Sequence, residues 1–352
     1  MSWLSDSVVN HLRRVTDLPD LSHTKYRCLE KIATGGMGTV YLAEDTQLRR
    51  QIALKILTLP DSPGELADRL MQEARIIAAL EHPGIVPIHD VGALADGRVF
   101  YTMKLVKGRR LDEQVKQVSS LPELLRLFQK VCEAVAFAHS HRVIHRDLKP
   151  ENIMVGDFGE VLVMDWGLAK VLSPNMRPQT STDRPGRAEK DSPTLKNSRT
   201  TEHGTVLGTP AYMAPEQARG EIDQLDERTD VYALGAILYF LLTGAHPMAS
   251  DSASGENLEP QPVRPRKKNP KIPKQVAAIY FKAAAPDKTT RYESARHLSA
   301  DIERFLNGQP VSSYRESIFE TLGRWISKNK FVVALLLVYV IVRFLIYFLS
   351  KI

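Results

Sequence analysis

The sequence predicts an α+β protein with a small β-rich N-terminal lobe, a larger helical lobe and a C-terminal membrane-spanning helix. Between residues 26 and 59, short runs rich in β-branched residues are typical of strands. After residue 121, apolar residues recur at helical spacing, and residues 331–349 are almost entirely apolar. The strand-like and helix-like runs are YRCLEKIA, TVYLAED, QIALKILTL, LPELLRLFQKVCEAVAFAHSH and DVYALGAILYFLLTG.

The composition is that of a globular protein rather than a disordered one. Of 352 residues, 43% are apolar, which is enough for a sizeable core. The formal charge is +6, but the basic residues are scattered apart from a cluster at 264–268. This pattern favours contact with an anionic membrane surface, and no nucleic-acid partner is expected. Cys28 and Cys132 stand alone, so neither a disulfide framework nor a zinc site is predicted.

The apolar segment 331–349 has the length of a single-pass membrane helix. Its nineteen residues carry one charge, Arg343, which lies toward one end and can reach the interface. A basic collar of Arg324, Lys328 and Lys330 precedes it, with Trp325 as an interfacial anchor. These charges favour a cytoplasmic soluble body. A buried core helix is the alternative, and a homodimer formed through the span stays open, although the span has no small-xxx-small seam.

These patterns divide the chain into five parts. They are an N-terminal extension (1–25), the β-rich lobe (26–106), the helical lobe (107–308), a juxtamembrane segment (309–330) and the span (331–349). Within the helical lobe, residues 173–205 and 249–275 are rich in Pro, Ser, Thr and charge. Such segments bury too little apolar surface to offset the entropy of ordering, so both are expected to be mobile loops.

A glycine-rich turn, ATGGMGTV (33–40), connects the first two predicted strands. Glycines allow the backbone to approach a ligand and to point N–H groups at phosphate oxygens, but a plain hairpin is the alternative. Lys55 then ends the apolar run IALK, where a half-buried charge needs an anionic partner. Glu73, in the helix predicted over 65–80, is the candidate. A lysine that snorkels to the surface is the alternative.

The stretch HRDLKPEN (145–152) concentrates charged and polar side chains directly after a helix. Asp165, in MDWGLAK, follows Asn152 by thirteen residues and ends a short apolar run. Two short strands and a turn would bring Asp147, Asn152 and Asp165 together. Magnesium favours such oxygen ligands when substrate phosphates complete its shell. An ordinary strand end is the alternative for Asp165.

Taken in order, the glycine-rich loop, the IALK lysine, the helical glutamate, HRDLKPEN, DWG and APE resemble the signature of protein kinases. More narrowly, GGMGTVYLAED and GTPAYMAPEQ resemble the eukaryotic-like serine/threonine protein kinases of bacteria. The resemblance covers roughly residues 26–306. It implies the bilobal protein-kinase fold and transfer of the γ-phosphoryl group of Mg-ATP to Ser/Thr hydroxyls of protein substrates, including the chain itself.

The resemblance also implies a nucleotide site. Lys55, paired with Glu73, would hold the α- and β-phosphates beneath the glycine-rich loop. Val40, Ala53 and Met154 would enclose adenine. The remaining nucleotide-binding residues are Ala33, Thr34, Gly35, Gly36, Met37 and Gly38 of the loop, and the backbone of Leu105 and Val106.

For catalysis, the resemblance assigns Asp165 and Asn152 to Mg²⁺ and Asp147 to the substrate hydroxyl. Lys149 would lie near the transferring phosphoryl group. In the activation segment (165–216), Thr209 of GTPAYMAPE would reach toward Asp147 on a shelf for protein substrates.

Other residues receive structural or regulatory roles. Glu216 would pair with Arg291, and Asp230 would brace the catalytic loop. Arg146 precedes Asp147, as in kinases whose activation loop is phosphorylated, and Thr200, Thr201 and Thr205 are the expected autophosphorylation sites.

The sequence departs from the kinase pattern at three positions. Ala33 replaces the first loop glycine, Lys104 replaces an often acidic hinge residue, and Trp166 replaces the usual phenylalanine after the metal-binding aspartate. Trp166 brings an N–H that needs a partner and could favour either state of the activation switch. Two alternative functions are open. One is a pseudokinase scaffold, but the presence of Lys55 and Asp147 argues against it. The other is a small-molecule kinase, but the GTPAYMAPE shelf argues against that.

Overall fold

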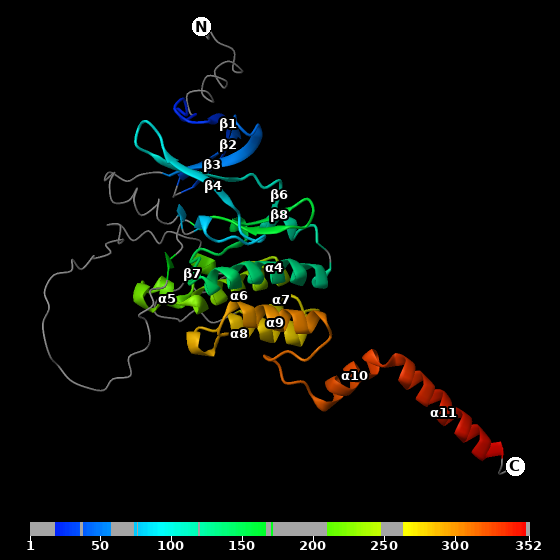
Figure 1. Ribbon diagram of the computed structural model, residues 1–352. Helices are drawn as coiled ribbons and strands as arrows, with labels where there is room; N and C mark the ends of the chain where they lie inside the picture. Colours follow the sequence, from blue (N-terminus) through cyan, green and yellow to red (C-terminus); the bar gives the residue numbers. More distant parts are fainter. Residues whose placement is uncertain are drawn as a thin grey trace, which may run out of the picture.

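The structure is a computed structural model that describes residues 18–35, 38–57, 74–75, 77–118, 120–166, 170–171, 210–247 and 263–349. A β-rich lobe lies above a helical lobe, and a long helix extends away at the C-terminal end (Figure 1). The predicted α+β bilobal fold with an apolar C-terminal helix is thereby confirmed.

An antiparallel sheet with the strand order β1-β2-β3-β5-β4 forms the N-terminal lobe. Its strands are β1 (Tyr26–Gly35), β2 (Gly38–Asp45), β3 (Arg50–Leu57), β4 (Ile88–Ala93) and β5 (Val99–Lys104). β1 and β2 flank the glycine-rich turn as predicted. Of the helix predicted over 65–80, only the end is described, and residues 74, 75, 77 and 78 are helical.

Strand β3 is apolar on both faces, because successive side chains point to opposite sides of a sheet. One face packs into a cluster within the lobe through Ile52, Leu54 and Ile56. On the other face, Ala53 and Leu57 join a second cluster that includes Leu162 of the C-terminal lobe. Lys55 lies between Ala53 and Leu57 on this second face. The strand therefore directs its one buried charge toward the space between the lobes.

Helices dominate the C-terminal lobe, with α4 and α6 at its centre. The helices are α3 (Leu111–Gln114), α4 (Leu121–Ser140), α5 (Pro215–Ala218), α6 (Glu227–Thr243), α7 (Pro265–Lys268), α8 (Lys274–Ala283) and α9 (Ala295–Leu306). Ser120 caps α4 and Asp226 caps α6, each by accepting a backbone N–H bond. α6 ends at Gly244, whose φ of 67° is the left-handed conformation common at helix ends.

Short strands and 3₁₀ turns frame the loops that carry the predicted motifs. The strands are β6 (Gly108–Arg110), β7 (Val143–Ile144), β8 (Ile153–Gly156), β9 (Val161–Val163) and β10 (Lys170–Val171), and the 3₁₀ turns are η1 (Pro150–Asn152), η2 (Pro210–Tyr212), η3 (Ile222–Gln224) and η4 (Lys288–Thr290). β6, β8 and β9 form one sheet, and β7 pairs with β10. Val86 donates to the Val163 carbonyl at 3.2 Å, which fixes β9 to the chain that leads into β4.

The segment predicted as a mobile loop, 249–275, contains helical structure in its second half. Residues 263–275 contain α7 and the start of α8, while residues 249–262 lie outside the described residues. Pro265 and Ile272 are buried and anchor this polar stretch to the lobe. Average composition misled the prediction here, because two buried apolar side chains are enough to fix a short segment. The other predicted loop, 173–205, also falls outside the described residues.

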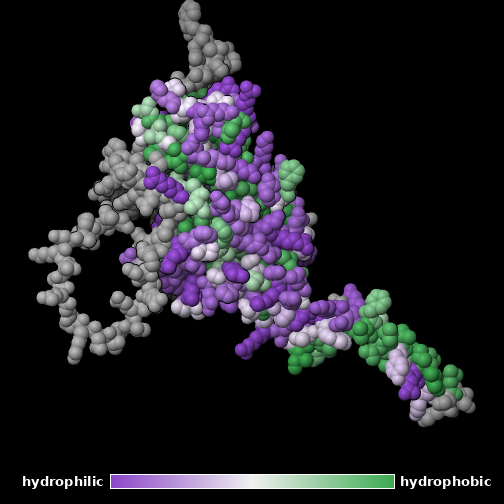
Figure 2. Space-filling view, in the orientation of Figure 1, coloured by the Kyte–Doolittle hydropathy of each residue, from purple (hydrophilic) through white to green (hydrophobic). Residues whose placement is uncertain are grey.

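Two helices follow the C-terminal lobe. α11 (Lys330–Leu349) coincides with the predicted span, and its mean hydropathy of 2.7 is high enough for a membrane-crossing helix. Its surface is hydrophobic along most of its length (Figure 2). α10 (Ile318–Lys328) precedes it within the juxtamembrane segment, where no helix is predicted from the sequence.

Candidate active site

Lys55 and Asp165 meet between the lobes. Lys55 is 5% exposed on β3, and its Nζ donates a hydrogen bond to Asp165 Oδ1. Burial alone would raise the pKa of Asp165, but the Lys55 ammonium outweighs burial and holds that pKa below its ordinary value. Asp165 is therefore an anion next to the Lys55 ammonium, so the pair could meet a bound cation through Asp165 and a bound phosphate through Lys55.

The backbone of Asp165 is held in an uncommon conformation. Its φ is 56°, in the left-handed region that non-glycine residues seldom adopt. The preceding residue, Met164, donates its N–H to the Asn152 carbonyl at 2.8 Å, and its own carbonyl lies 3.0 Å from His145 Nε2. These bonds impose the turn that directs Asp165 away from β9 and toward Lys55. Such strain persists where surrounding structure enforces it, often at functional sites.

Asp147, Lys149 and Asn152 form a compact polar group below this contact. Asp147 Oδ2 accepts from Lys149 Nζ at 2.8 Å and from Asn152 Nδ2 at 3.2 Å. Asn152 Nδ2 also donates to the Asp147 carbonyl at 2.8 Å. The Asp147 and Lys149 side chains are each 20% exposed, so a ligand in the cleft can reach both. The arrangement can accept a proton from a hydroxyl and place a cation next to it.

Asp230 supports the loop from beneath. Its carboxylate accepts the backbone N–H groups of His145 and Arg146 at 2.8 and 2.9 Å, and Oδ2 lies 2.9 Å from His139 Nε2. Burial alone would raise the pKa of Asp230, but the bonds from His139 and His145 hold it below its ordinary value. Arg146 has a φ of 67°, so this bracing also fixes a strained residue next to Asp147.

Glu216 and Arg291 tie α5 to the base of the lobe. Arg291 Nη1 and Nη2 donate to the two oxygens of Glu216 at 2.7 and 2.9 Å, and both residues are 3% exposed. Gln217 continues the connection, since its Nε2 donates to the Arg146 carbonyl at 2.8 Å. The APE element is thus bonded on one side to a buried arginine and on the other to the loop that carries Asp147.

The residues predicted to enclose the nucleotide base are largely apolar. Val40, Ala53, Leu105 and Val106 belong to or pack against one cluster, and Met154 stands opposite a member of that cluster, Leu162, across the β8–β9 pair. In the glycine-rich turn, Gly35 pairs with Gly38, and Ala33 and Thr34 lie on β1. A Cβ on Gly38 would lie 2.2 Å from the Ile56 carbonyl oxygen, and its φ of 148° also requires glycine.

Trp166 is 1% exposed and fills the space below His145. The ring centroids lie 4.6 Å apart, and the indole Nε1–H donates to the Val163 carbonyl at 3.2 Å. The indole N–H that tryptophan brings to this position is therefore satisfied by a backbone carbonyl of the same turn.

The oxygen donors fit a hard divalent cation. Asp165 offers a carboxylate and Asn152 an amide oxygen, because hydrogen bonds to Asp147 occupy the Asn152 nitrogen. Mg²⁺ commonly takes one or two such protein ligands together with substrate phosphates. Among the residues that the structure describes, no group of three or more His, Cys, Asp or Glu is placed to hold a metal, so phosphate oxygens would be needed to complete the shell.

Several predicted site residues fall outside the described part of the chain. They are Gly36, Met37, Glu73, Thr200, Thr201, Thr205 and Thr209. The expected Lys55–Glu73 pair and the autophosphorylation sites therefore stay predictions. Conversely, sequence reasoning missed the positions of His145 and Gln217, although each adjoins a motif that it identified.

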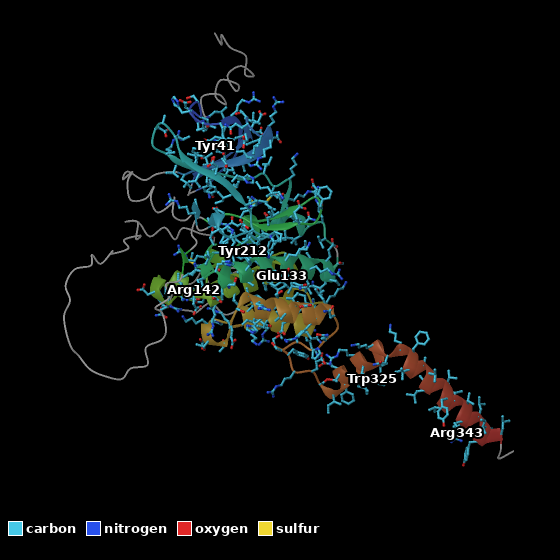
Figure 3. The ribbon with its side chains drawn as sticks, in the orientation of Figure 1. Tyr41, Glu133, Arg142, Tyr212, Trp325 and Arg343 are labelled. Atoms are coloured by element: carbon cyan, nitrogen blue, oxygen red, sulfur yellow. The ribbon has the colours of Figure 1, made fainter. Side chains whose placement is uncertain are left out.

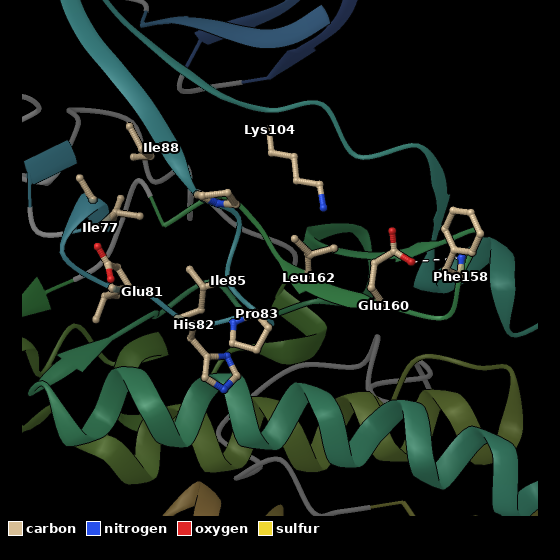
Figure 4. Close-up of a pocket in the computed structure, with 13 residues that line it drawn as sticks. Ile77, Glu81, His82, Pro83, Ile85, Ile88, Lys104, Phe158, Glu160 and Leu162 are labelled. Atoms are coloured by element: carbon tan, nitrogen blue, oxygen red, sulfur yellow. Dashed lines mark hydrogen bonds between the residues drawn. The ribbon is translucent and has the colours of Figure 1, made fainter. Parts of the chain in front are cut away.

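A separate cavity of about 760 Å³ lies beside Lys104 (Figure 4). Ile77, His82 and Ile85 line it on one side and Phe158 and Glu160 on the other. It contains none of Lys55, Asp147, Asn152 or Asp165. The candidate catalytic groups therefore lie outside this cavity.

The fold and the cleft define a protein-kinase domain. Residues 26–308 match the protein kinase domain family, and the chain belongs to that family. It is 37% identical over 304 residues to the serine/threonine-protein kinase PknD of Chlamydia abortus and 36% identical over 308 residues to PknD of Protochlamydia amoebophila. Its place is therefore among the bacterial, eukaryotic-like serine/threonine protein kinases.

These matches cover 81% of the chain but only 31% and 30% of the two relatives, so the chain spans about a third of the length of the curated relatives it matches. Among solved structures, the kinase domain of Mycobacterium tuberculosis PknI superposes with a TM-score of 0.59. That match covers 81% of this chain and 96% of the other, at 24% identity, and supports the fold.

Proposed function

We propose that the chain is an active serine/threonine protein kinase that transfers the γ-phosphoryl group of Mg-ATP to protein hydroxyls. The observation that carries the proposal is the joint placement of Lys55, Asp147, Asn152 and Asp165 in one cleft, with Lys55 bonded to Asp165 and Asn152 to Asp147. Positioning and electrostatics account for most of the catalysis of phosphoryl transfer, and this cleft supplies both.

ATP would bind with adenine against the apolar cluster of Val40, Ala53 and Met154. The backbone at Leu105 and Val106 would meet the edge of the base. Lys55 would hold the α- and β-phosphates, with Glu73 as its partner, while the glycine-rich turn covers them. The 5% exposure of Lys55 supports this role, because its charge is directed into the cleft and not to bulk solvent.

Asp165 and Asn152 would hold Mg²⁺. When bound, the ion would neutralise charge that develops between the β- and γ-phosphates. The low pKa of Asp165 keeps its carboxylate charged at neutral pH, as this role requires. Asp147 would orient the substrate hydroxyl and accept its proton, and Lys149, 2.8 Å from Asp147, would stabilise the transferred group.

The substrate class follows from the shelf and from the relatives. The GTPAYMAPE element ends in α5, which the Glu216–Arg291 pair and Gln217 fix beside the Asp147 loop. A rigid surface at that place suits an extended protein chain better than a small molecule. Arg146 and the hydroxyls of Thr200, Thr201 and Thr205 support activation by autophosphorylation.

The kinase domain would be anchored in the membrane by α11 and face the cytoplasm. The helix is twenty residues long and apolar, and Arg324, Lys328 and Lys330 precede or begin it. Positive charge next to a span favours the cytoplasmic side.

The full chain, purified and incubated with γ-labelled ATP, Mg²⁺ and a generic protein substrate, tests the proposal. Label is expected on Ser and Thr of the substrate. Phosphopeptide mapping is expected to find it also in the activation segment (165–216) of the chain itself, at Thr200, Thr201 or Thr205. Nucleotide binding without label on either protein would favour the pseudokinase scaffold. Label on small molecules alone would favour the small-molecule kinase.

A further inference from the structure

The apolar residues of α10 gather on one face of the helix. At about 100° per residue, Ile318, Leu322, Trp325 and Ile326 fall within one arc with Phe319 at its edge. All five are exposed, from 40% for Ile326 to 85% for Phe319. An exposed apolar stripe of this kind marks a surface that binds a membrane or another molecule. Figure 3 shows Trp325 on α10, between the kinase domain and α11.

The opposite face of α10 is bonded to the kinase domain. Glu320, about half a turn from the middle of the apolar arc, accepts from Lys274 of α8 at 3.1 Å and from the Tyr314 hydroxyl at 3.1 Å. Glu320 also completes the capping box with Ser317 at the start of the helix. The polar face of α10 is thus bonded to the C-terminal lobe through one ion pair, Lys274–Glu320, whose side chains are 55% and 29% exposed, and the apolar stripe lies on the opposite face.

The apolar stripe continues directly into the candidate membrane span. Only Asn329 separates α10 from α11, and its N–H donates to the Trp325 carbonyl at 2.9 Å. Figure 2 shows the hydrophobic surface of α10 next to that of α11. A helix that begins to cross the membrane at Lys330 places the preceding turns within the layer of lipid headgroups.

The charges beside the stripe suit an anionic surface. Lys328 and Lys330 lie at the α10–α11 junction, and Arg315 precedes α10. On the same lobe, α7 presents three exposed basic residues, Arg266, Lys267 and Lys268. A second copy of the chain would bring like charges together, whereas anionic headgroups would neutralise them.

We propose that α10 lies flat in the interfacial layer of an anionic membrane, with its apolar stripe at the boundary of headgroups and acyl chains and its polar face clasped to the kinase domain through Lys274–Glu320. This inference rests on the proposed membrane anchoring by α11. Amphipathic helices with basic polar faces commonly bind membranes in this way. As a consequence, the base of the C-terminal lobe lies at the lipid surface and is not joined to the membrane by a free linker.

Tryptophan quenching in lipid nanodiscs tests the placement of α10. The full chain with Trp3→Phe retains Trp166, which is buried in the kinase domain, and Trp325. The same chain with Trp325→Phe added supplies the Trp166 baseline. The Trp325 emission is expected to fall by about twofold or more with lipids brominated near the headgroup, and less with lipids brominated near the chain ends, because interfacial helices lie about 5–10 Å into the boundary.

Two further arms separate the alternatives. Ile318→Ser combined with Leu322→Ser should reduce the quenching, and anionic discs should give more quenching than zwitterionic ones. Lys274→Gln should increase amide hydrogen exchange at the start of α10, while the control Lys271→Gln, which removes an exposed charge from the same lobe, should not.

Retention of the chain in vesicles after alkaline extraction measures anchoring by α11 independently. If the chain is retained but Trp325 is unquenched in discs that hold one copy, the inference about α10 is overturned and the anchor stands. Protection of Trp325 only in discs with two copies would show that a second chain covers the stripe and would also overturn it. Loss of the chain on extraction would overturn the anchor itself.

Discussion

Trp166 packs against His145 with ring centroids 4.6 Å apart and an interplanar angle of 49°. His145 in turn reaches the carbonyl of Met164, directly before Asp165. The large ring at position 166 therefore supports the turn that presents the candidate metal ligand.

Replacing Trp166 with Phe tests this support. The change removes part of a buried ring and one hydrogen bond, so we expect a loss of about 1–2 kcal/mol in the free energy of unfolding. The loss should be moderate because the Val163 carbonyl still accepts from Val86 at 3.2 Å. Trp166→Ala should cost about 3–5 kcal/mol. Denaturant unfolding measures both, and a Phe variant as stable as the wild type would contradict the packing role.

The Glu216–Arg291 pair should matter far more than an exposed ion pair. Arg291→Met leaves Glu216 charged and buried, which should cost about 3–5 kcal/mol. The matched control is Arg219→Met, which breaks the exposed 2.7 Å pair with Glu221 and should change stability by less than about 1 kcal/mol. Thermal unfolding of the two variants provides the comparison. Equal effects would show that burial does not decide the strength of the first pair.

Stability should depend on pH through Glu216. Burial alone would raise its pKa, but Arg291 holds that pKa below its ordinary value. A lowered pKa contributes stability that is present above the ordinary value of about 4.3 and is lost as pH falls through the folded-state pKa. Protonated Glu216 resembles Gln, so the difference in Tm between wild type and Glu216→Gln should be largest near neutral pH and shrink in acid. A difference that grows on acidification would contradict this assignment.

Asp165 should determine how Mg²⁺ affects nucleotide binding. Asp165→Asn removes the anionic donor, so we expect at least about a tenfold loss of ATP affinity with Mg²⁺, equivalent to about 1.4 kcal/mol, and a smaller change without it. Lys55→Met should weaken binding in both conditions. Asp157→Asn, at an exposed carboxylate in the β8–β9 turn, is the control. Calorimetric titration with and without Mg²⁺ measures these affinities; an unchanged Mg²⁺ effect in Asp165→Asn would rule out its role.

Much of the fold was predictable because local patterns and tertiary structure agree. The nearly continuous apolar run of β3 is typical of a strand buried on both faces, and the side-chain period of two places Lys55 on the same face as Ala53 and Leu57. The β8–β9 hairpin between Asn152 and Asp165 could be predicted from their spacing, which leaves room for two short strands and a turn. In each case a few residues close in sequence determine the geometry.

Features that depend on distant contacts could not be predicted. The extent of the loop at 249–275 was overestimated because Ile272 is anchored by packing against the rest of the lobe. The ion pair that ties α10 to the C-terminal lobe depends on Lys274, which lies 46 residues before Glu320. The apolar spacing of Ile318, Leu322 and Trp325 was a signal for α10, but its orientation required the structure.

The most direct test of the central claim compares phosphoryl transfer by the wild type and Asp147→Asn. The full chain, with Mg²⁺ and γ-labelled ATP, is assayed on a generic protein substrate, and Asp157→Asn serves as a charge-matched control. Loss of a positioned general base typically slows a reaction by about 10²–10⁴-fold, so Asp147→Asn should lose at least about a hundredfold while Asp157→Asn stays near wild type. If wild type and Asp147→Asn transfer equally little label, the chain is not an active kinase and the scaffold takes its place.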